Sequence, residues 1–204
     1  MKVGDSVQHS LDEWERRNLE AAMLHACNAV DGTARKVFPT VGSNRRFTRL
    51  LRENYAILGP MGAPGIDIDK TRFPVTVPHP TTPDGRPDIA DVIYGIHRCS
   101  HGHGDELPAG FALIPNAEGP AGFTGLESTP GTLRLSDRII FGLLAVAVLS
   151  PANKGQSVPG YYLTYGKQVL LIDKWWGRAA DFAAVVAAGP VLPSVTLDFS
   201  NWKR

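Results

Sequence analysis

The chain has 204 residues and a nearly balanced charge, with 21 basic and 20 acidic side chains and a formal net charge of +1. This length suits a single domain with a buried core. The balance excludes a polyanion-coating protein of the histone kind, so contact with nucleic acid would need a local basic patch. Cys27 and Cys99 are too few for a disulfide framework or a four-cysteine metal site, and they favour a reducing compartment.

The hydropathy pattern predicts no membrane segment. The first residues, MKVGDSVQHSLDEWERRN, lack the apolar core of a secretion signal. The most apolar run, over residues 139–149, is much shorter than the roughly 20 residues that cross a bilayer as a helix. We therefore expect a cytoplasmic protein with no membrane partner.

A long first helix is predicted to begin at Ser10. The sequence Ser10-Leu11-Asp12-Glu13 has the form of a capping box, in which a serine and a glutamate satisfy free amides at a helix start. Apolar residues then follow at helical spacing as far as Pro39: Leu19, Met23, Cys27, Val30, Ala34 and Val37.

A second helix is expected over residues 44–57, with an apolar face and an arginine-rich face. Arg45, Arg49 and Arg52 lie on the polar face and are candidate RNA-binding residues. A basic stripe can hold phosphates even on a neutral protein. An ordinary solvated helix face is the alternative interpretation.

Proline and glycine dominate residues 59–87 and predict a long surface loop, with a short extended piece near residues 73–77. Loops of this length often form lids or binding surfaces, and family-specific insertions are equally common.

The second half of the chain alternates extended and helical patterns. Short extended segments are expected over residues 110–115 and 132–135, and Ser136 then begins a strongly apolar helix over residues 137–149. Residues 161–172 predict a β-hairpin, and a last helix should run from Trp175 or Trp176 to Ala188. The whole pattern indicates one mainly α domain over residues 1–204, a helical bundle with a small β-hairpin and a long Pro/Gly-rich loop.

The densest group of reactive side chains ends a third predicted helix. Asp88 caps this helix, and its apolar stripe leads into Arg98-Cys99-Ser100-His101-Gly102-His103. On an α-helix, positions five apart differ by about 140°, so Arg98 and His103 can flank one cleft, while His101 lies near the arginine's own face. A second arginine–histidine pair, Arg72 and His79, has two prolines between its members and cannot lie on a helix.

These features resemble the HEPN superfamily, whose motif is an arginine, four to six residues and then a histidine. The resemblance rests on the long first helix, the arginine-rich second helix and the segment from Arg98 to His103, and it covers residues 11–104 with the core helix at 139–149. One position departs from the family, because Cys99 follows the arginine where a polar Asn, Asp or His is common.

The resemblance implies an all-helical, HEPN-like bundle that forms a homodimer, in which two motifs build one metal-independent endoribonuclease centre. In such a centre His103, or His101 as the alternative, would be the general base or acid at the ribose 2′-hydroxyl. Arg98 would hold the scissile phosphate and stabilise its developing charge. It further implies an RNA substrate, no cofactor, and an antitoxin or another regulatory protein as partner, as in toxin or phage-defence nucleases.

Two other functions remain open on sequence grounds. A metal-dependent hydrolase would use His97, His101 and His103 with Asp105, although Arg98 would repel the cation. A non-catalytic HEPN-like module would bind RNA or protein without cleaving it. Arg98 also has a purely structural alternative, as a cap of its helix end or a partner of Asp91 or Asp105.

Overall fold

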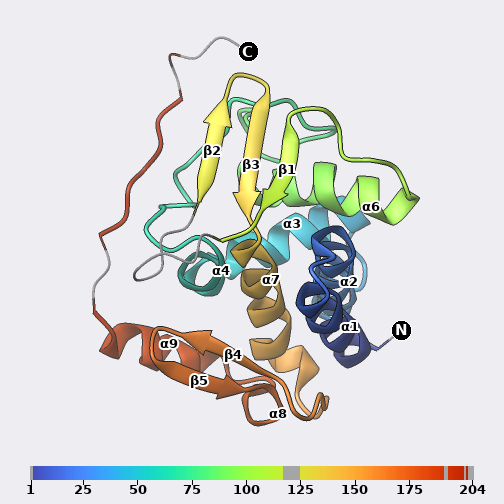
Figure 1. Ribbon diagram of the computed structural model, residues 1–204, viewed down its shortest axis with the longest axis vertical. Coiled ribbons are helices and arrows are strands. Elements are labelled where there is room, and N and C mark those ends of the chain that lie inside the picture. Colours follow the sequence, from blue (N-terminus) through green and yellow to red (C-terminus); the bar gives the residue numbers. More distant parts are fainter. Residues whose placement is uncertain (1, 117–124, 191–192, 200, 202–204) are drawn as a thin grey trace.

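A single apolar helix, α7 (Arg138–Leu149), lies at the centre of the computed structural model, which describes residues 2–116, 125–190, 193–199 and 201, apart from the side chains of His101 and His103. Every α7 residue except Arg138 and Phe141 is buried. The helix packs between α4 and α2 (Figure 1). The predicted core helix is therefore confirmed.

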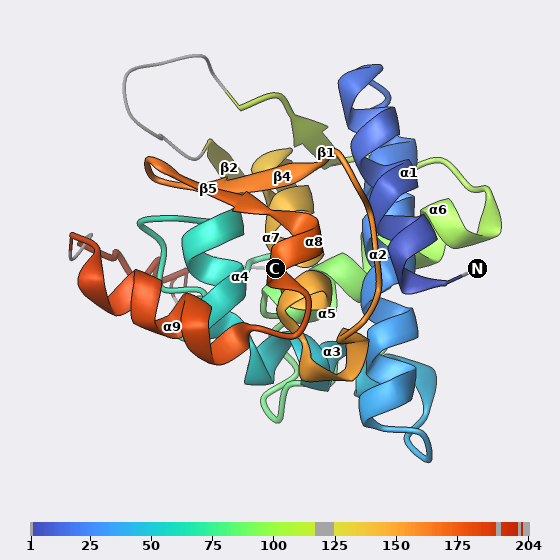
Figure 2. The ribbon, with the colours of Figure 1, turned by 90° about the horizontal axis from the view of Figure 1, so that it is seen from below.

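Two antiparallel helices, α1 (Val3–Glu15) and α2 (Leu19–Val37), replace the single long helix expected from Ser10 (Figures 1 and 2). The chain turns at Arg17, whose φ of 63° is left-handed, and Asn18 caps α2 by accepting a hydrogen bond from the Ala21 amide. The capping-box prediction is wrong. Ser10 is buried within α1, where its hydroxyl donates to the Ala22 carbonyl at 2.7 Å.

The predicted second helix is divided at Asn54 into α3 (Ser43–Glu53) and α4 (Tyr55–Gly62). The side-chain amide nitrogen of Asn54 donates back to the Leu50 carbonyl at 2.8 Å. The predicted apolar positions are buried, namely Phe47, Leu50, Leu51 and Leu58. α4 approaches α7 so closely that a Cβ added to Gly142 would lie 2.8 Å from Leu58 Cδ1 and 2.9 Å from Gly62 Cα.

The proline-rich stretch after α4 was expected to be a surface excursion, but it packs against the core. It buries Ile68, Phe73, Val75 and Val77. Residues 73–77 form no strand, which corrects the extended piece predicted there. The loop returns at Asp88, where α5 (Ile89–Val92), the π-helix η1 (Ile93–Arg98) and α6 (Cys99–His103) follow without a break.

A three-stranded sheet lies at one end of α7. Its order is β1 (Phe111–Ile114), β3 (Thr132–Ser136) and β2 (Leu126–Thr129), with β3 parallel to β1 and antiparallel to β2. The two predicted extended segments are thus paired strands, and β2 was not predicted. The link expected between them falls partly on residues 117–124, outside the described residues. Ser136 Oγ accepts the Arg138 amide at 3.2 Å and so helps to begin α7.

The C-terminal part forms the predicted hairpin, β4 (Tyr162–Tyr165) and β5 (Gln168–Leu171), with Leu163 and Leu170 on its buried face. A short 3-10 turn, η2 (Pro151–Asn153), precedes it. The predicted last helix is α9 (Ala179–Ala188), which begins later than Trp175 or Trp176 because the chain bends at Gly177 with a φ of 78°. The short helix α8 (Ile172–Trp175) before this bend was not predicted.

The mainly α architecture is confirmed, with two small sheets added to the helices. Among the helices of the described residues, none combines the length and apolar character needed to span a bilayer.

Candidate functional site

The segment that carries the arginine–histidine motif is one continuous helical rod with a π-helical centre. The Asp88 carboxylate caps its start by accepting the Asp91 amide at 3.0 Å. Ile89, Ile93 and Ile96 are buried as predicted, and Gly104, with a φ of 75°, follows its end. The π-helix is a departure from the regular helix expected. Insertions of this kind are rare and recur at functional sites, since they re-aim the side chains that follow.

Arg98 is the last residue of the π-helix, and its side chain turns towards α6. A Cβ built on Gly102 would lie 3.1 Å from Arg98 Nη1, so the guanidinium rests against the α6 backbone at Gly102. In the sequence, Gly102 is the residue between His101 and His103. The Arg98 side chain is 26% exposed, and its Cζ lies 6.0 Å from the centre of the Tyr94 ring. Its Nε is buried and has no hydrogen-bond partner among the described residues.

One carboxylate serves two arginines at this corner of the bundle. Asp31 on α2 accepts hydrogen bonds on Oδ1 from Arg46 Nε at 3.2 Å and Nη2 at 2.9 Å. Its other oxygen lies 3.6 Å from Arg98 Nη2, which is an ion pair without the geometry of a strong hydrogen bond. Two guanidinium groups against one carboxylate leave one positive charge uncompensated within this group. Arg98 therefore has hydrogen-bond donors and positive charge that remain available to bind an anion.

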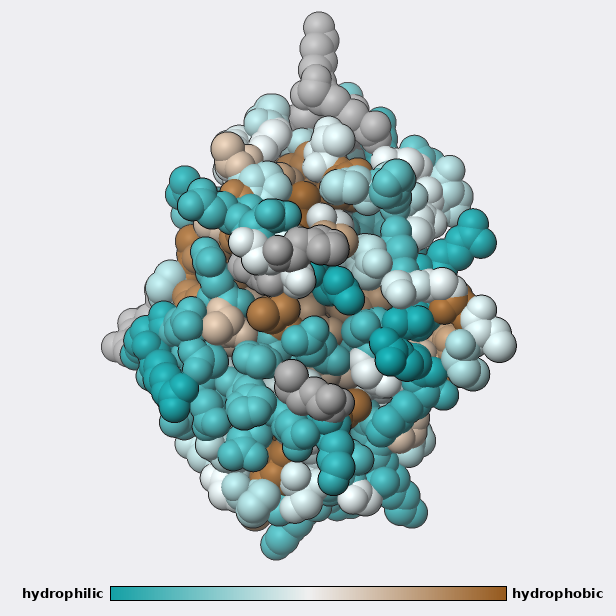
Figure 3. Space-filling model, turned by 90° about the vertical axis from the view of Figure 1, so that its right-hand side faces the viewer, coloured by the Kyte–Doolittle hydropathy of each residue, from teal (hydrophilic) through white to brown (hydrophobic). Residues whose placement is uncertain are grey.

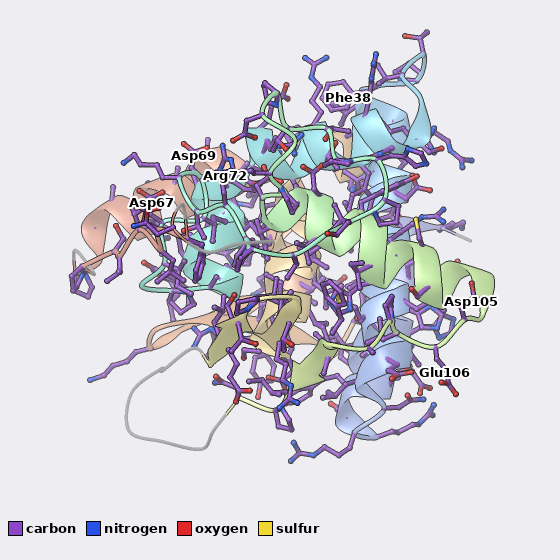
Figure 4. All side chains as sticks on the ribbon, turned by 90° about the horizontal axis from the view of Figure 1, so that it is seen from above. Phe38, Asp67, Asp69, Arg72, Asp105 and Glu106 are labelled. Atoms are coloured by element: carbon purple, nitrogen blue, oxygen red, sulfur yellow. The ribbon has the colours of Figure 1, made fainter. Side chains whose placement is uncertain are left out.

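The structure thus gives Arg98 a carboxylate partner other than those considered from the sequence. Asp91 pairs with Arg52, and Asp105 lies beyond the end of α6 beside Glu106 (Figure 4). The partner is Asp31, which a search along the same helix would not find. Hydrophilic residues cover most of the face that carries α1, α2 and α6 (Figure 3).

His101 and His103, the candidate catalytic histidines, belong to α6 by their backbone, and their side chains lie outside the described residues. Their pairing with Arg98 therefore stays a prediction. The backbone places both directly beside Gly102, against which the guanidinium rests.

The two cysteines near Arg98 have the character of neutral thiols. Burial raises the pKa of Cys99, and the charge of Arg98 opposes this only in part. Burial also raises the pKa of Cys27 far above its ordinary value. Because a thiolate is the nucleophilic form, this corner favours chemistry by other groups than sulfur.

The three candidate RNA-binding arginines of α3 do not share one exposed face. Arg45 is exposed. Arg49 is exposed as well, where it pairs with Glu53 at 2.7 Å and its Cζ stacks 4.3 Å from the Phe38 ring centre. Arg52 turns inwards instead. The basic stripe is therefore reduced to Arg45 and Arg49.

Arg52 belongs to a buried network that anchors the start of the motif segment. It donates to Asp88 from Nε at 2.7 Å and Nη2 at 2.9 Å, and it pairs with Asp91 at 3.0 Å. Tyr55 donates to Asp88 at 2.9 Å, and the Thr81 hydroxyl bonds both Arg52 and Asp91. Sequence reasoning recognised Asp88 as a cap but missed this network, whose members come from three separate segments.

Arg52 and Asp88 are each stabilised in the ionised form within this network. Burial by itself raises the pKa of Asp88, but the hydrogen bonds from Arg52, the Asp91 amide and Tyr55 outweigh it and hold that pKa below its usual value. Burial and the neighbouring charge of Asp88 raise the pKa of Tyr55. The network positions the rod, and because its one arginine meets two carboxylates, it carries a net negative charge.

The metal alternative finds no support among the described side chains. No three His, Cys, Asp or Glu residues of that part of the chain lie close enough to hold a metal ion, and His101 and His103 fall outside the search. His97, the first ligand of that hypothesis, is fully buried. His9 and His25 face each other across α1 and α2 with ring centres 5.3 Å apart, a pair that the sequence did not predict.

The fold and this corner define a mainly α protein with a half-buried arginine on an interrupted helix. The chain belongs to the Rv1289 family, whose sequence model matches residues 2–203. It is 45% identical over 202 residues to uncharacterized protein Rv1289 of Mycobacterium tuberculosis (strain ATCC 25618 / H37Rv), covering 98% of this chain and 95% of that protein. The same identity and coverage relate it to uncharacterized protein Mb1320 of Mycobacterium bovis. No solved structure matches the chain.

Proposed function

We propose that this chain is a metal-independent endoribonuclease of the HEPN kind, with Arg98 as the phosphate-holding residue. The observation that carries the proposal is the state of Arg98. Its side chain is 26% exposed, and its guanidinium shares a carboxylate with Arg46 and rests on the backbone between two histidines. A positive charge that is partly removed from water and incompletely paired binds a phosphate more strongly than a solvated one.

The chemistry follows from the groups on α6. His103, or His101, would take the proton of the ribose 2′-hydroxyl as its oxygen attacks the adjacent phosphorus, because an imidazole titrates near neutral pH. The phosphorus–O5′ bond then breaks, and O5′ leaves with a proton supplied by a second imidazole. The products are a 2′,3′-cyclic phosphate and a 5′-hydroxyl end. Arg98 would stabilise the charge that grows on the non-bridging oxygens.

A homodimer would supply the second imidazole by bringing two motifs together. The proposal therefore includes a symmetric dimer of the toxin or phage-defence type in the cytoplasm, acting on RNA and controlled by an antitoxin or another regulatory protein. Arg45 and Arg49, which are both exposed on α3, would contact the RNA backbone beyond the centre. No cofactor is required by this chemistry.

The test is cleavage of a structured RNA in EDTA by the wild type and by Arg98→Ala, His101→Ala and His103→Ala. Arg178→Ala is the matched control, because Arg178 is an exposed arginine on the distant α9 end that pairs with Asp181. Loss of Arg98 should lower the rate on the order of 10²- to 10³-fold, as for other transition-state donors, while the control cleaves normally. Cleavage that needs added zinc or manganese would contradict the proposal. RNA retention without cleavage would identify a binding module instead.

A further inference from the structure

A second cleft, which shares no lining residue with the Arg98 corner, lies at the other end of α1. It has a volume of about 530 Å³, within the range of small-molecule sites. Its walls come from the end of α1 and the turn after it, from the start of α7, from Met61 of α4 and from β4. Segments far apart in the sequence therefore meet around one concave space.

Aromatic side chains form much of this wall. Trp14 packs edge-on against Phe141 with ring centres 4.9 Å apart, and its Nε1 donates to Asp137 at 3.2 Å, which holds the indole in place. Tyr162 of β4 and Tyr161, which precedes that strand, line another side, and the Tyr161 hydroxyl donates to Asp12. Tyr162 is 57% exposed, a large ring at the mouth of the cleft. Such a wall suits a flat aromatic ligand, because offset and edge-on ring contacts add to the burial of apolar surface.

Two arginines line this cleft: Arg17 is exposed, whereas the half-buried Arg138 has no carboxylate partner within the described residues. Its Nε donates to the Met61 carbonyl at 3.2 Å, and neither terminal nitrogen donates to a described residue. Burial alone lowers the pKa of this guanidinium, with no raising contribution from a carboxylate. A half-buried charge of this kind is costly unless an anion meets it.

The acidic residues of the cleft do not fill that role. Both oxygens of the buried Asp137 are already bonded, one to the Asn116 amide at 2.8 Å and the other to Trp14. Glu15 also lines the cleft, but it is exposed, and no ion pair joins it to Arg138 among the described residues. Arg138 is thus the group inside the cleft that still needs a counter-charge.

We propose that this cleft binds a small aromatic anion, with the ring against Trp14 and the two tyrosines and the acidic group on the terminal nitrogens of Arg138. A carboxylate and a phosphate both match the guanidinium fork, so the shared chemistry is a planar ring with one acidic substituent. The inference is independent of the proposed nuclease activity, which uses other residues.

The test titrates the full-length protein by calorimetry with four probes that separate the two features. 1-Naphthoate and 1-naphthyl phosphate carry ring and charge, 1-naphthalenemethanol carries the ring alone, and inorganic phosphate carries the charge alone. At least one of the first two should bind, at least about 10-fold more tightly than either of the last two. The tighter of the first two then tells whether the acidic group is a carboxylate or a phosphate. Equal affinity for the neutral ring, or no binding of either charged ring, would overturn the proposal.

Variants assign the charge to Arg138. Arg138→Met should weaken the charged probes on the order of 10- to 100-fold, and Arg138→Lys should weaken them less because it keeps the charge but not the fork. Arg134→Met is the control, an exposed arginine on β3 paired with Glu127. Unchanged affinity in Arg138→Met would also overturn the proposal. If that variant does not fold, Arg138→Lys and the four-probe comparison on the wild type decide.

Discussion

The buried Asp88 network should contribute strongly to stability, and two substitutions at one position can divide its contribution. Asp88→Asn keeps a side chain that caps α5 but removes the charge that faces Arg52 at 2.7 and 2.9 Å. Asp88→Ala removes both the charge and the cap. Asp181→Asn is the control, because Asp181 lies near the start of a helix, in its first turn, and pairs with an arginine as Asp88 does, but its side chain is 54% exposed.

The magnitude follows from the contacts that each variant loses. Hydrogen bonds to charged groups contribute about 1.5–3 kcal/mol each, and breaking a buried ion pair costs about 3–5 kcal/mol. Arg52 is 27% exposed and keeps Asp91 at 3.0 Å, so solvent and the second carboxylate reduce the loss. We expect Asp88→Asn to cost about 2–3 kcal/mol and Asp88→Ala about 1 kcal/mol more. The control should change stability by less than about 0.5 kcal/mol.

Urea denaturation followed by circular dichroism measures these differences at pH 7 and again below pH 4. Because the pKa of Asp88 is lowered in the folded state, its stabilisation is complete above the unfolded pKa of about 3.9 and is lost as the pH falls through the lower folded pKa. The gap between wild type and Asp88→Asn should therefore shrink on acidification. An Asp88→Asn variant as stable as Asp181→Asn at pH 7 would refute the reasoning.

Three further predictions concern close contacts and titration. Gly142→Ala should destabilise the fold by about 1–3 kcal/mol, since its Cβ would meet α4 at 2.8 Å, whereas Gly59→Ala, with its nearest contact at 3.7 Å, should be neutral or stabilising in thermal melts. Gly102→Ala should displace Arg98 and slow RNA cleavage while the melting temperature stays within a few degrees, and equal activity would argue against the position assigned to the guanidinium. The pKa of His25 is lowered, first by burial and then by His9, so NMR titration should find it below 6.5, and His9→Gln should raise it part of the way back.

Sequence patterns predicted the parts of the fold that depend on local periodicity. The apolar run of α7, the hairpin around Gly166 and the Asp88 cap were all recognisable, because each carries its signal within a dozen residues. The capping box at Ser10 failed because a serine can equally bond a neighbouring helix, here the Ala22 carbonyl. The helix actually breaks at Arg17, where the sequence contains no glycine or proline to mark the turn.

The candidate site was predictable only along its own helix. Arg98 and the histidines of α6 were found from their spacing, but the carboxylate that meets Arg98 is Asp31, 67 positions earlier in the chain. Arg52 was expected on an exposed face because α3 is amphipathic. It turns inwards because it forms ion pairs with Asp88 and Asp91. Partners brought together by tertiary packing leave no periodic signal. The π-helix that ends at Arg98 was not predicted either, because the apolar spacing of its residues fits a regular α-helix.

The most direct test of the central claim is the chemical end left on RNA cut by the purified protein in EDTA. The account predicts 2′,3′-cyclic phosphate and 5′-hydroxyl ends from the wild type, and a strong reduction of both in Arg98→Ala with unchanged folding. A 5′-phosphate end, or the same yield of cyclic ends from Arg98→Ala, would contradict the assignment of Arg98 as the group that holds the phosphate.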